Sequence, residues 1–206
     1  MKIKICGIRR LKDVQIVNKY LPDFVGFVFY KKSPRNISPK EAKVLSSKLD
    51  DSITPVGVFL NENPANIVQL FKTGIIDIVQ LHGDESEEYI DNLKKLAKKE
   101  TGRDLKVIKT VVFKKDNLIF LKHPNSDYYL FNLADEEIEN NSIWESIRQD
   151  LGKPFFLSGD LSPENIIGVL DDIKPYAIDV SSASETNNFK DEDKIKEIVG
   201  IVRENF

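Results

Sequence analysis

Short apolar runs rich in Val, Ile and Phe recur along this chain about every 20 to 30 residues, and each is followed by a polar segment with helical patterning. This alternation is typical of repeated βα units, in which each crossover returns the chain to the same side of a parallel sheet. Eight strands are expected: Lys2–Cys6, Phe24–Phe29, Thr54–Phe59, Ile76–Leu81, Lys106–Thr110, Tyr128–Asn132, Pro154–Leu157 and Ala177–Val180.

Several segments between these strands carry apolar residues at spacings of three and four, as amphipathic helices do. They are Pro39–Leu49, Pro64–Thr73, Glu85–Lys98, Pro163–Asp172 and Asp191–Glu204. Three helices are expected to begin at a polar N-cap followed by a proline in the first turn, a favoured pairing. Those starts are Ser38-Pro39, Asn63-Pro64 and Ser162-Pro163.

Eight strands with eight crossovers in 206 residues predict the α/β class and a small (β/α)8 TIM barrel, formed as a single domain by residues 1–206. An open doubly wound sheet is the alternative. It is less favoured, because no glycine-rich dinucleotide fingerprint follows the first strand. In a barrel, the residues that carry function lie just after the carboxyl ends of the strands.

Composition excludes several classes of protein. The formal charge is -3, and the 30 basic and 33 acidic residues are interspersed, so no basic stripe for nucleic acid is expected. No stretch approaches the roughly 18 apolar residues that a membrane helix needs, and no signal peptide is evident, so we expect a cytoplasmic protein. One cysteine and two histidines make neither an internal disulfide nor a typical zinc site, which favours chemistry without a metal.

The only cysteine, Cys6, lies between the first strand and Gly7. A thiol at a strand end can serve as a base or nucleophile, yet free cysteines are also often buried fillers, and the residues alone leave both readings open. Strand alternation places Lys4 on the same face as Cys6, where an ammonium group would favour the thiolate.

Other strand ends carry polar side chains that could bind a ligand. Arg35, after the second strand, is either a solvated loop residue or a two-pronged grip for a carboxylate. Gln80 and His82 lie two apart at the end of the fourth strand and share a face, although a lone histidine is more often structural than catalytic.

The ends of the sixth, seventh and eighth strands bear on phosphate and acid chemistry. Ser158-Gly159 and Ser181-Ser182 lie where barrels often bind phosphate, although Asp160 beside them would repel a dianion. Asn132 ends the sixth strand, and its carboxamide cannot donate a proton to a leaving oxygen.

Taken together, these segments resemble the phosphoribosylanthranilate isomerase family of tryptophan biosynthesis. The shared signatures are Lys-Ile-Cys-Gly-Ile at residues 4–8, Gly-Phe-Val-Phe-Tyr-Lys-Lys-Ser-Pro-Arg at 26–35, Val-Gly-Val-Phe at 56–59, Val-Gln-Leu-His-Gly-Asp-Glu-Ser at 79–86 and Pro-Tyr-Ala-Ile-Asp-Val-Ser-Ser at 175–182. They occur in the family's order and span almost the whole chain.

The resemblance implies a (β/α)8 barrel and an Amadori rearrangement of a phosphorylated aminoaldose to an aminoketose, without cofactor or metal. Cys6 matches the family's general base, Arg35 the residue that holds the anthranilate carboxylate, and Asp179 a polar residue near the catalytic centre. Gln80 and His82 belong to the fourth-strand motif and are expected to contact substrate. Phosphate is expected at Ser158, Gly159, Ser181 and Ser182.

The chain departs from the family where the acid and the phosphate grip are expected. Asn132 occupies the position of the family's general acid, an aspartate. Residues 133–143 contain no glycine, and Asp160 and Ala183 replace family glycines. Two hypotheses follow: an isomerase in which Asp135, Glu136 or a bound water supplies the proton, or a catalytically impaired paralogue that binds a small carboxylate ligand or a protein partner. A monomer is favoured over a homodimer.

Overall fold

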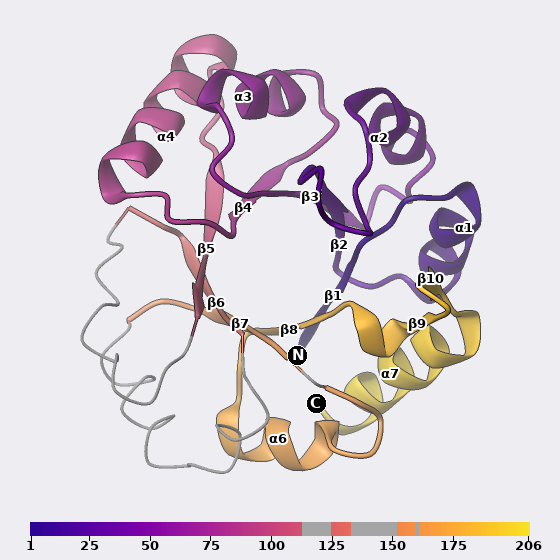
Figure 1. Ribbon diagram of the computed structural model, residues 1–206. Helices are drawn as coiled ribbons and strands as arrows, with labels where there is room; N and C mark the ends of the chain where they lie inside the picture. The colour runs from indigo at the N-terminus through magenta and orange to yellow at the C-terminus, as the bar shows by residue number, and fades with distance from the viewer. Residues whose placement is uncertain (113–124, 133–151, 160) are drawn as a thin grey trace.

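Eight parallel strands close into a barrel in this computed structural model, which describes residues 1–112, 125–132, 152–159 and 161–206 (Figure 1). The strands are β1 Lys2–Cys6, β2 Phe24–Val28, β3 Thr54–Phe59, β4 Ile78–Leu81, β5 Lys106–Val112, β6 Tyr128–Asn132, β7 Phe155–Ser158 and β8 Ala177–Val180. Each pairs with its sequence neighbour, and β1 pairs with β8 to complete the ring. The predicted (β/α)8 barrel is therefore confirmed, and the open doubly wound sheet is wrong.

Helices surround the ring of strands on the outside (Figure 1). The described helices are α1 Leu11–Tyr20, α2 Pro39–Ser46, α3 Pro64–Lys72, α4 Glu87–Thr101, α6 Ile166–Ile173 and α7 Glu192–Asn205. The sequence analysis omitted α1, whose N-cap is Arg10 rather than a typical capping residue. Asp13 supplies the cap instead, because its carboxylate accepts hydrogen bonds from the backbone N–H groups of Arg9 and Arg10.

Two of the three predicted N-caps are confirmed. Ser38 and Asn63 accept hydrogen bonds from backbone N–H groups in the first turns of α2 and α3. Ser162 is wrong as an N-cap, since α6 begins one turn later with Asn165 in that position. The Asn165 side chain accepts a hydrogen bond from the Ser162 N–H, and residues 163–165 form a turn ahead of the helix.

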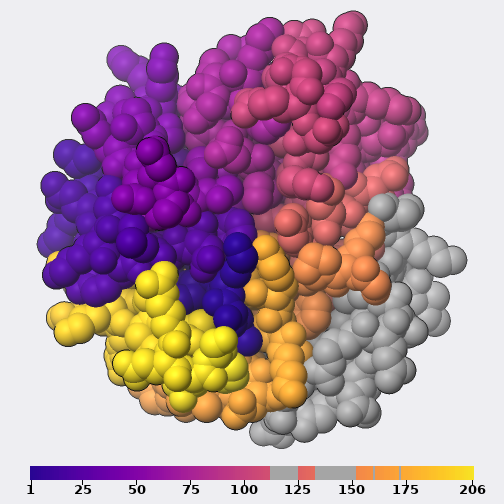
Figure 2. All heavy atoms as spheres, turned by 180° about the vertical axis from the view of Figure 1, so that it is seen from behind, coloured from indigo at the N-terminus to yellow at the C-terminus, as the bar shows by residue number. Residues whose placement is uncertain are grey.

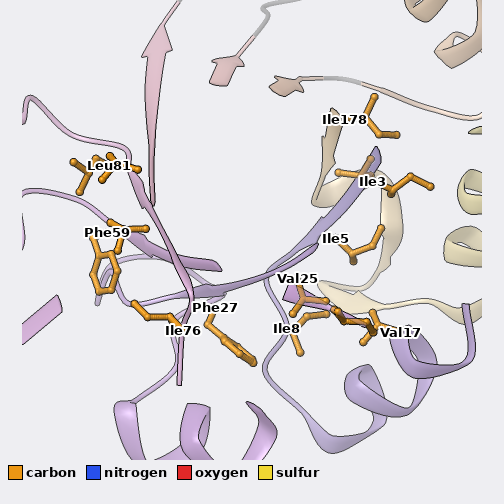
Figure 3. Close-up of a cluster of buried hydrophobic side chains, with 14 of the residues drawn as sticks. Ile3, Ile5, Ile8, Val17, Val25, Phe27, Phe59, Ile76, Leu81 and Ile178 are labelled. Atoms are coloured by element: carbon orange, nitrogen blue, oxygen red, sulfur yellow. The ribbon is translucent and has the colours of Figure 1, made fainter. Parts of the chain in front are cut away.

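Alternating side chains divide the apolar residues into two layers. One set points outward and packs under the helices, as Figure 3 shows for Ile3, Ile5, Val25 and Phe27 of the strands with Val17 of α1. The other set fills the barrel interior: Phe24, Val56, Ile78, Ile108, Leu130, Phe156 and Ala177. Most of these lie toward the amino ends of their strands. Apolar side chains therefore fill the barrel interior at the amino ends of the strands, and polar side chains occupy the carboxyl ends.

The two ends of the chain meet where the barrel closes. The amino group of Met1 donates a hydrogen bond to the carbonyl oxygen of Phe206, at 3.0 Å. Figure 2 shows the first and last residues, in indigo and yellow, side by side on one face of the molecule. Met1, just before β1, is thus tied to Phe206, just after α7.

A buried ion pair braces the loops after β3 and β4. Lys109 Nζ lies 2.8 Å from Glu85 Oε2, and both side chains are almost fully buried. Glu85 also accepts hydrogen bonds from the backbone N–H groups of Asn61, at 2.8 Å, and Gly83, at 3.0 Å. Gly83 is needed here, because a Cβ would lie 2.4 Å from Asn61 Oδ1.

Replacing Lys109 with Met is expected to lower the free energy of unfolding by about 3–5 kcal/mol, because it leaves the Glu85 carboxylate buried without a countercharge. Urea denaturation of both proteins measures the difference. Lys98→Met, which removes an exposed pair with Asp104, is the matched control and should change stability by less than about 1 kcal/mol. Equal effects of the two substitutions would contradict the assigned role of the buried pair.

Candidate active site

A cavity of about 670 Å³ opens at the carboxyl ends of the strands. Ten of the candidate site residues from the sequence line it: Cys6, Arg35, Gln80, His82, Asn132, Ser158, Gly159, Asp179, Ser181 and Ser182. The cavity therefore brings together side chains from both ends of the chain, as expected for the loops and strand ends of a barrel.

Strand register aligns four polar residues across four neighbouring strands. Asn132 of β6 pairs with Ser158 of β7, Ser158 pairs with Asp179 of β8, and Asp179 pairs with Lys4 of β1. Ser158 Oγ donates a hydrogen bond to Asn132 Oδ1 at 3.3 Å. Asn132, Ser158 and Asp179 thus form one wall of the cavity, and Lys4 lies beside them without lining it.

Cys6 lies on the same face of β1 as Lys4 and is 9% exposed, so the thiol is largely buried although it lines the cavity. Cys6, the last residue of β1, is therefore buried, as a filler would be, and also lines the cavity, as a base would need to. Burial raises the pKa of the Cys6 thiol, and the nearby Lys4 ammonium opposes that rise. A thiolate here depends on its charged neighbours.

Lys4 is fully buried, and its Nζ lies 2.7 Å from Asp179 Oδ2. Burial lowers the pKa of Lys4, but Asp179 and Cys6 outweigh it and the net pKa is raised, so the side chain is an ammonium. His82 follows β4, and burial lowers its pKa, which favours the neutral imidazole.

Two glycines make room for the thiol and for Arg35. A Cβ at Gly26 would lie 2.6 Å from Cys6 Sγ. Gly7 has a φ of +91°, and a Cβ there would lie 2.5 Å from Arg35 Cδ. Any larger residue at either position would displace a candidate site side chain.

Arg35 is held by a carboxylate of the chain itself. Its Nε and Nη2 donate hydrogen bonds to Glu185 Oε1 and Oε2, at 2.8 and 2.7 Å. Lys190 Nζ lies 2.8 Å from Glu185 Oε1 and also donates to the carbonyl oxygen of Ser181, at 3.0 Å. The guanidinium, the carboxylate and the ammonium therefore fix the loop after β2 against the loop after β8.

Glu185 and Lys190 belong to a small hairpin, β9 Glu185–Thr186 and β10 Phe189–Lys190, which the sequence analysis did not predict. Asn187 and Asn188 both have positive φ, as a two-residue hairpin turn requires. The adjacent asparagines were the available signal for this turn. The ring of Phe189 lies under the guanidinium groups of Arg9 and Arg10, at 4.6 and 4.0 Å, which ties the hairpin to the segment after β1.

Two candidate residues lie outside the described part of the chain. Asp135 and Glu136, which could replace the family's acid, fall within residues 133–151, and Asp160 also falls outside. Within the described ranges, no group of three or more His, Cys, Asp and Glu side chains could hold a metal ion. No described helix is long and apolar enough to cross a membrane.

Comparison with known proteins decides the family. The family model for N-(5'-phosphoribosyl)anthranilate isomerase matches residues 3–200. The isomerase of Clostridium acetobutylicum is 40% identical over 98% of both chains, and that of Endomicrobium trichonymphae is 40% identical over the same shares. The chain belongs to this family.

Solved structures of phosphoribosylanthranilate isomerases have the same fold. One, in complex with reduced 1-(o-carboxyphenylamino)-1-deoxyribulose 5-phosphate, superposes with a TM-score of 0.84 at 33% identity and covers 99% of both chains. The enzyme from Thermotoga maritima superposes with a TM-score of 0.82 at 32% identity, again over 99% of both chains. The barrel that carries the cavity is therefore the fold found in solved structures of this family.

The Arg35–Glu185–Lys190 cluster predicts a pH-dependent contribution to stability. Burial raises the pKa of Glu185, but hydrogen bonds and charges from Arg35 and Lys190 outweigh it and hold the net pKa below the ordinary value of 4.5. A carboxyl group with a lowered pKa in the folded state stabilises the protein above its unfolded pKa, and the contribution is lost as pH falls through the folded pKa.

Glu185→Gln is therefore expected to be less stable than the wild type at neutral pH, with a difference that shrinks as pH falls below 4.5. Urea denaturation over a range of acidic pH measures it. Glu197→Gln, at an exposed position of α7, is the control and should follow the wild type at each pH. A Glu185→Gln difference that stays constant with pH would rule out this assignment.

Proposed function

We propose that the chain isomerises N-(5'-phosphoribosyl)anthranilate to 1-(o-carboxyphenylamino)-1-deoxyribulose 5-phosphate, an aldose–ketose type Amadori rearrangement in tryptophan biosynthesis. The observation that carries the proposal is a single cavity lined by the thiol of Cys6, the guanidinium of Arg35 and the strand ends at Ser158 and Ser181. Membership of the isomerase family supports the same reaction.

Cys6 is proposed as the general base. In the family's reaction a proton reaches the furanose ring oxygen, the C–O bond at C1′ breaks, and a Schiff base forms. The Cys6 thiolate then takes the proton from C2′. The S–H bond forms as the C2′–H bond breaks, and the electron pair moves into a C1′–C2′ double bond while the imine nitrogen gains electrons. Tautomerisation of this enolamine yields the ketose, with no covalent bond to sulfur.

The charged and polar side chains around the cavity are proposed to hold the two anionic ends of the substrate. Glu185 occupies Nε and one hydrogen of Nη2 of Arg35, and the Nη1 edge is proposed to receive the anthranilate carboxylate. Backbone N–H groups and hydroxyls at Ser158, Gly159, Ser181 and Ser182 are proposed to bind the phosphate. Gln80, His82 and Asp179 are proposed to contact the sugar, which lies between the carboxylate and phosphate ends of the substrate.

Asn132 raises the question of the proton donor. Its carboxamide accepts a hydrogen bond from Ser158 and cannot protonate the ring oxygen. We propose that a bound water delivers this proton, oriented by the row formed by Asn132, Ser158 and Asp179. The comparisons do not support the alternative of an impaired paralogue, because the relatives that match this chain over their full length are named as phosphoribosylanthranilate isomerases.

We further propose a cytoplasmic monomer that works without a cofactor. Large apolar side chains that are exposed in the described ranges come from different elements: Leu11, Leu21, Val44, Ile167, Phe189 and Phe206. Scattered exposed apolar residues are normal for a monomer. A relative from Thermotoga maritima is described as dimeric, so the family is not restricted to one state of assembly.

Cys6→Ala is expected to abolish turnover, because the base that removes the C2′ proton is lost. A steady-state assay that follows the loss of the fluorescent aminoaldose measures the effect. Leu21→Ala, at an exposed position outside the cavity, should retain wild-type kcat/KM. An active Cys6→Ala enzyme would refute the assigned base, and no turnover by the wild type at high enzyme concentration would refute the proposed function.

Asn132→Asp is expected to raise kcat/KM, because it adds a carboxyl group at the position of the family's acid; a positioned general acid contributes about 10²–10⁴ in rate. Asn132→Ala serves as the control, since it removes the carboxamide without adding an acid. The same assay compares the three proteins. An Asn132→Asp enzyme no faster than the wild type would show that delivery of the proton to the ring oxygen does not limit the rate.

A further inference from the structure

We propose that Lys4 is a positioning residue for the isomerase reaction: its buried ammonium stabilises the thiolate of Cys6, while Asp179 competes with the thiolate for that same ammonium. The inference rests on the proposed function and adds a residue to it. Lys4 does not line the cavity, so it acts on the substrate only through Cys6 and Asp179, which do.

The geometry places the Lys4 ammonium beside the Asp179 carboxylate and on the same strand face as the Cys6 thiol. Lys4 and Cys6 are two apart on β1 and share its inward face, while Asp179 is the residue of β8 paired with Lys4. Lys4 Nζ lies 2.7 Å from Asp179 Oδ2, and its charge also acts on the Cys6 thiol. An ammonium has three donors, so it can serve both neighbours at once.

Burying the charges of Lys4 and Asp179 costs free energy of desolvation, which suggests that the Lys4 charge has a role beyond packing. Lys4 is 0% exposed and Asp179 is 7% exposed. Replacing a buried ion pair with apolar residues of similar volume is often neutral or stabilising, so packing alone does not call for a lysine at this position. Asp179 Oδ1 is also buried without a hydrogen-bond partner among the described residues. This oxygen is therefore an acceptor that no described group of the protein satisfies.

The charges around Cys6 act in opposite directions. Burial raises the pKa of the thiol most, Lys4 lowers it, Asp179 raises it and Lys190 lowers it. The remaining titratable groups near the thiol are Arg35 and Tyr30 after β2 and His82 after β4. The net pKa of the thiol is raised, because burial has the largest effect. Lys4 and Asp179 act on it in opposite directions, so a change to either residue changes how much thiolate is present to take the C2′ proton.

The test is a titration of the thiol, read from the ultraviolet absorbance of the thiolate. Cys6 is the only cysteine of the chain, so the signal has one source, and Cys6→Ser is the blank. Lys4→Met is expected to raise the thiol pKa by about 1–3 pH units, and Asp179→Asn is expected to lower it. The pH at which kcat/KM rises, as the thiol loses its proton, should move in the same direction as the thiol pKa in each variant. Lys4→Arg keeps the positive charge, so its thiol pKa should lie much closer to the wild-type value than that of Lys4→Met.

Lys2→Met is the matched control, since Lys2 shares the strand and the inward parity of Lys4 but is partly exposed and pairs with Asp23. It should leave the titration unchanged. Lys4→Met leaves Asp179 buried without a countercharge and can prevent folding, so the double variant Lys4→Met/Asp179→Asn is compared with Asp179→Asn alone. The double variant should have the higher thiol pKa.

Unchanged titrations in Lys4→Met or the double variant, or shifts of the same sign in Lys4→Met and Asp179→Asn, would overturn the inference and leave the proposed function standing. If the variants show the expected shifts but the wild type has no turnover, the proposed function is overturned instead. A purely structural Lys4 would change stability without moving the thiol titration.

Discussion

The pairing of the first strand with the last is the constraint on which the rest of the structure depends. It closes the barrel, and its register places Lys4 beside Asp179 although 175 positions separate them in the chain. The ion pair lies buried at that junction, directly below Cys6. Slipping β1 by one residue would turn Lys4 and Cys6 outward and would bring Ile3 and Ile5 into the cavity. Barrel closure and the chemistry of the thiol thus depend on the same register.

A second network holds the opposite side of the thiol. The hairpin formed by β9 and β10 contributes Glu185 and Lys190, and these two residues fix Arg35 and the loop that carries Ser181. Arg9 and Arg10 in turn clamp the hairpin through Phe189. The loops after β1, β2 and β8 are therefore joined before any substrate arrives, which reduces the ordering that substrate binding has to impose.

The substitution at the end of β6 divides the site into two halves of different character. Cys6, the proposed base, and the Arg35 guanidinium lie beside the ion pairs Lys4–Asp179 and Arg35–Glu185. Asn132 contributes only neutral hydrogen bonding with Ser158. Protonation of the ring oxygen depends on the acidity of a donor, whereas proton removal depends on the thiolate. If Cys6 is the base, as proposed, ring opening is therefore the step expected to limit the reaction.

The sequence by itself determined the barrel and the cavity-lining residues. Apolar runs with intervening helical patterns specify βα repeats, and alternation within strands decides which side chains face inward, as it did for Gln80 and His82. Local signals failed where a helix lacks a standard cap, as at Arg10, and where a turn precedes the helix, as at Ser162. Only the tertiary structure decided the partners of the charged groups. The pairs Lys4–Asp179 and Arg35–Glu185 join residues 175 and 150 positions apart, and no local propensity records a contact created by closing the ring.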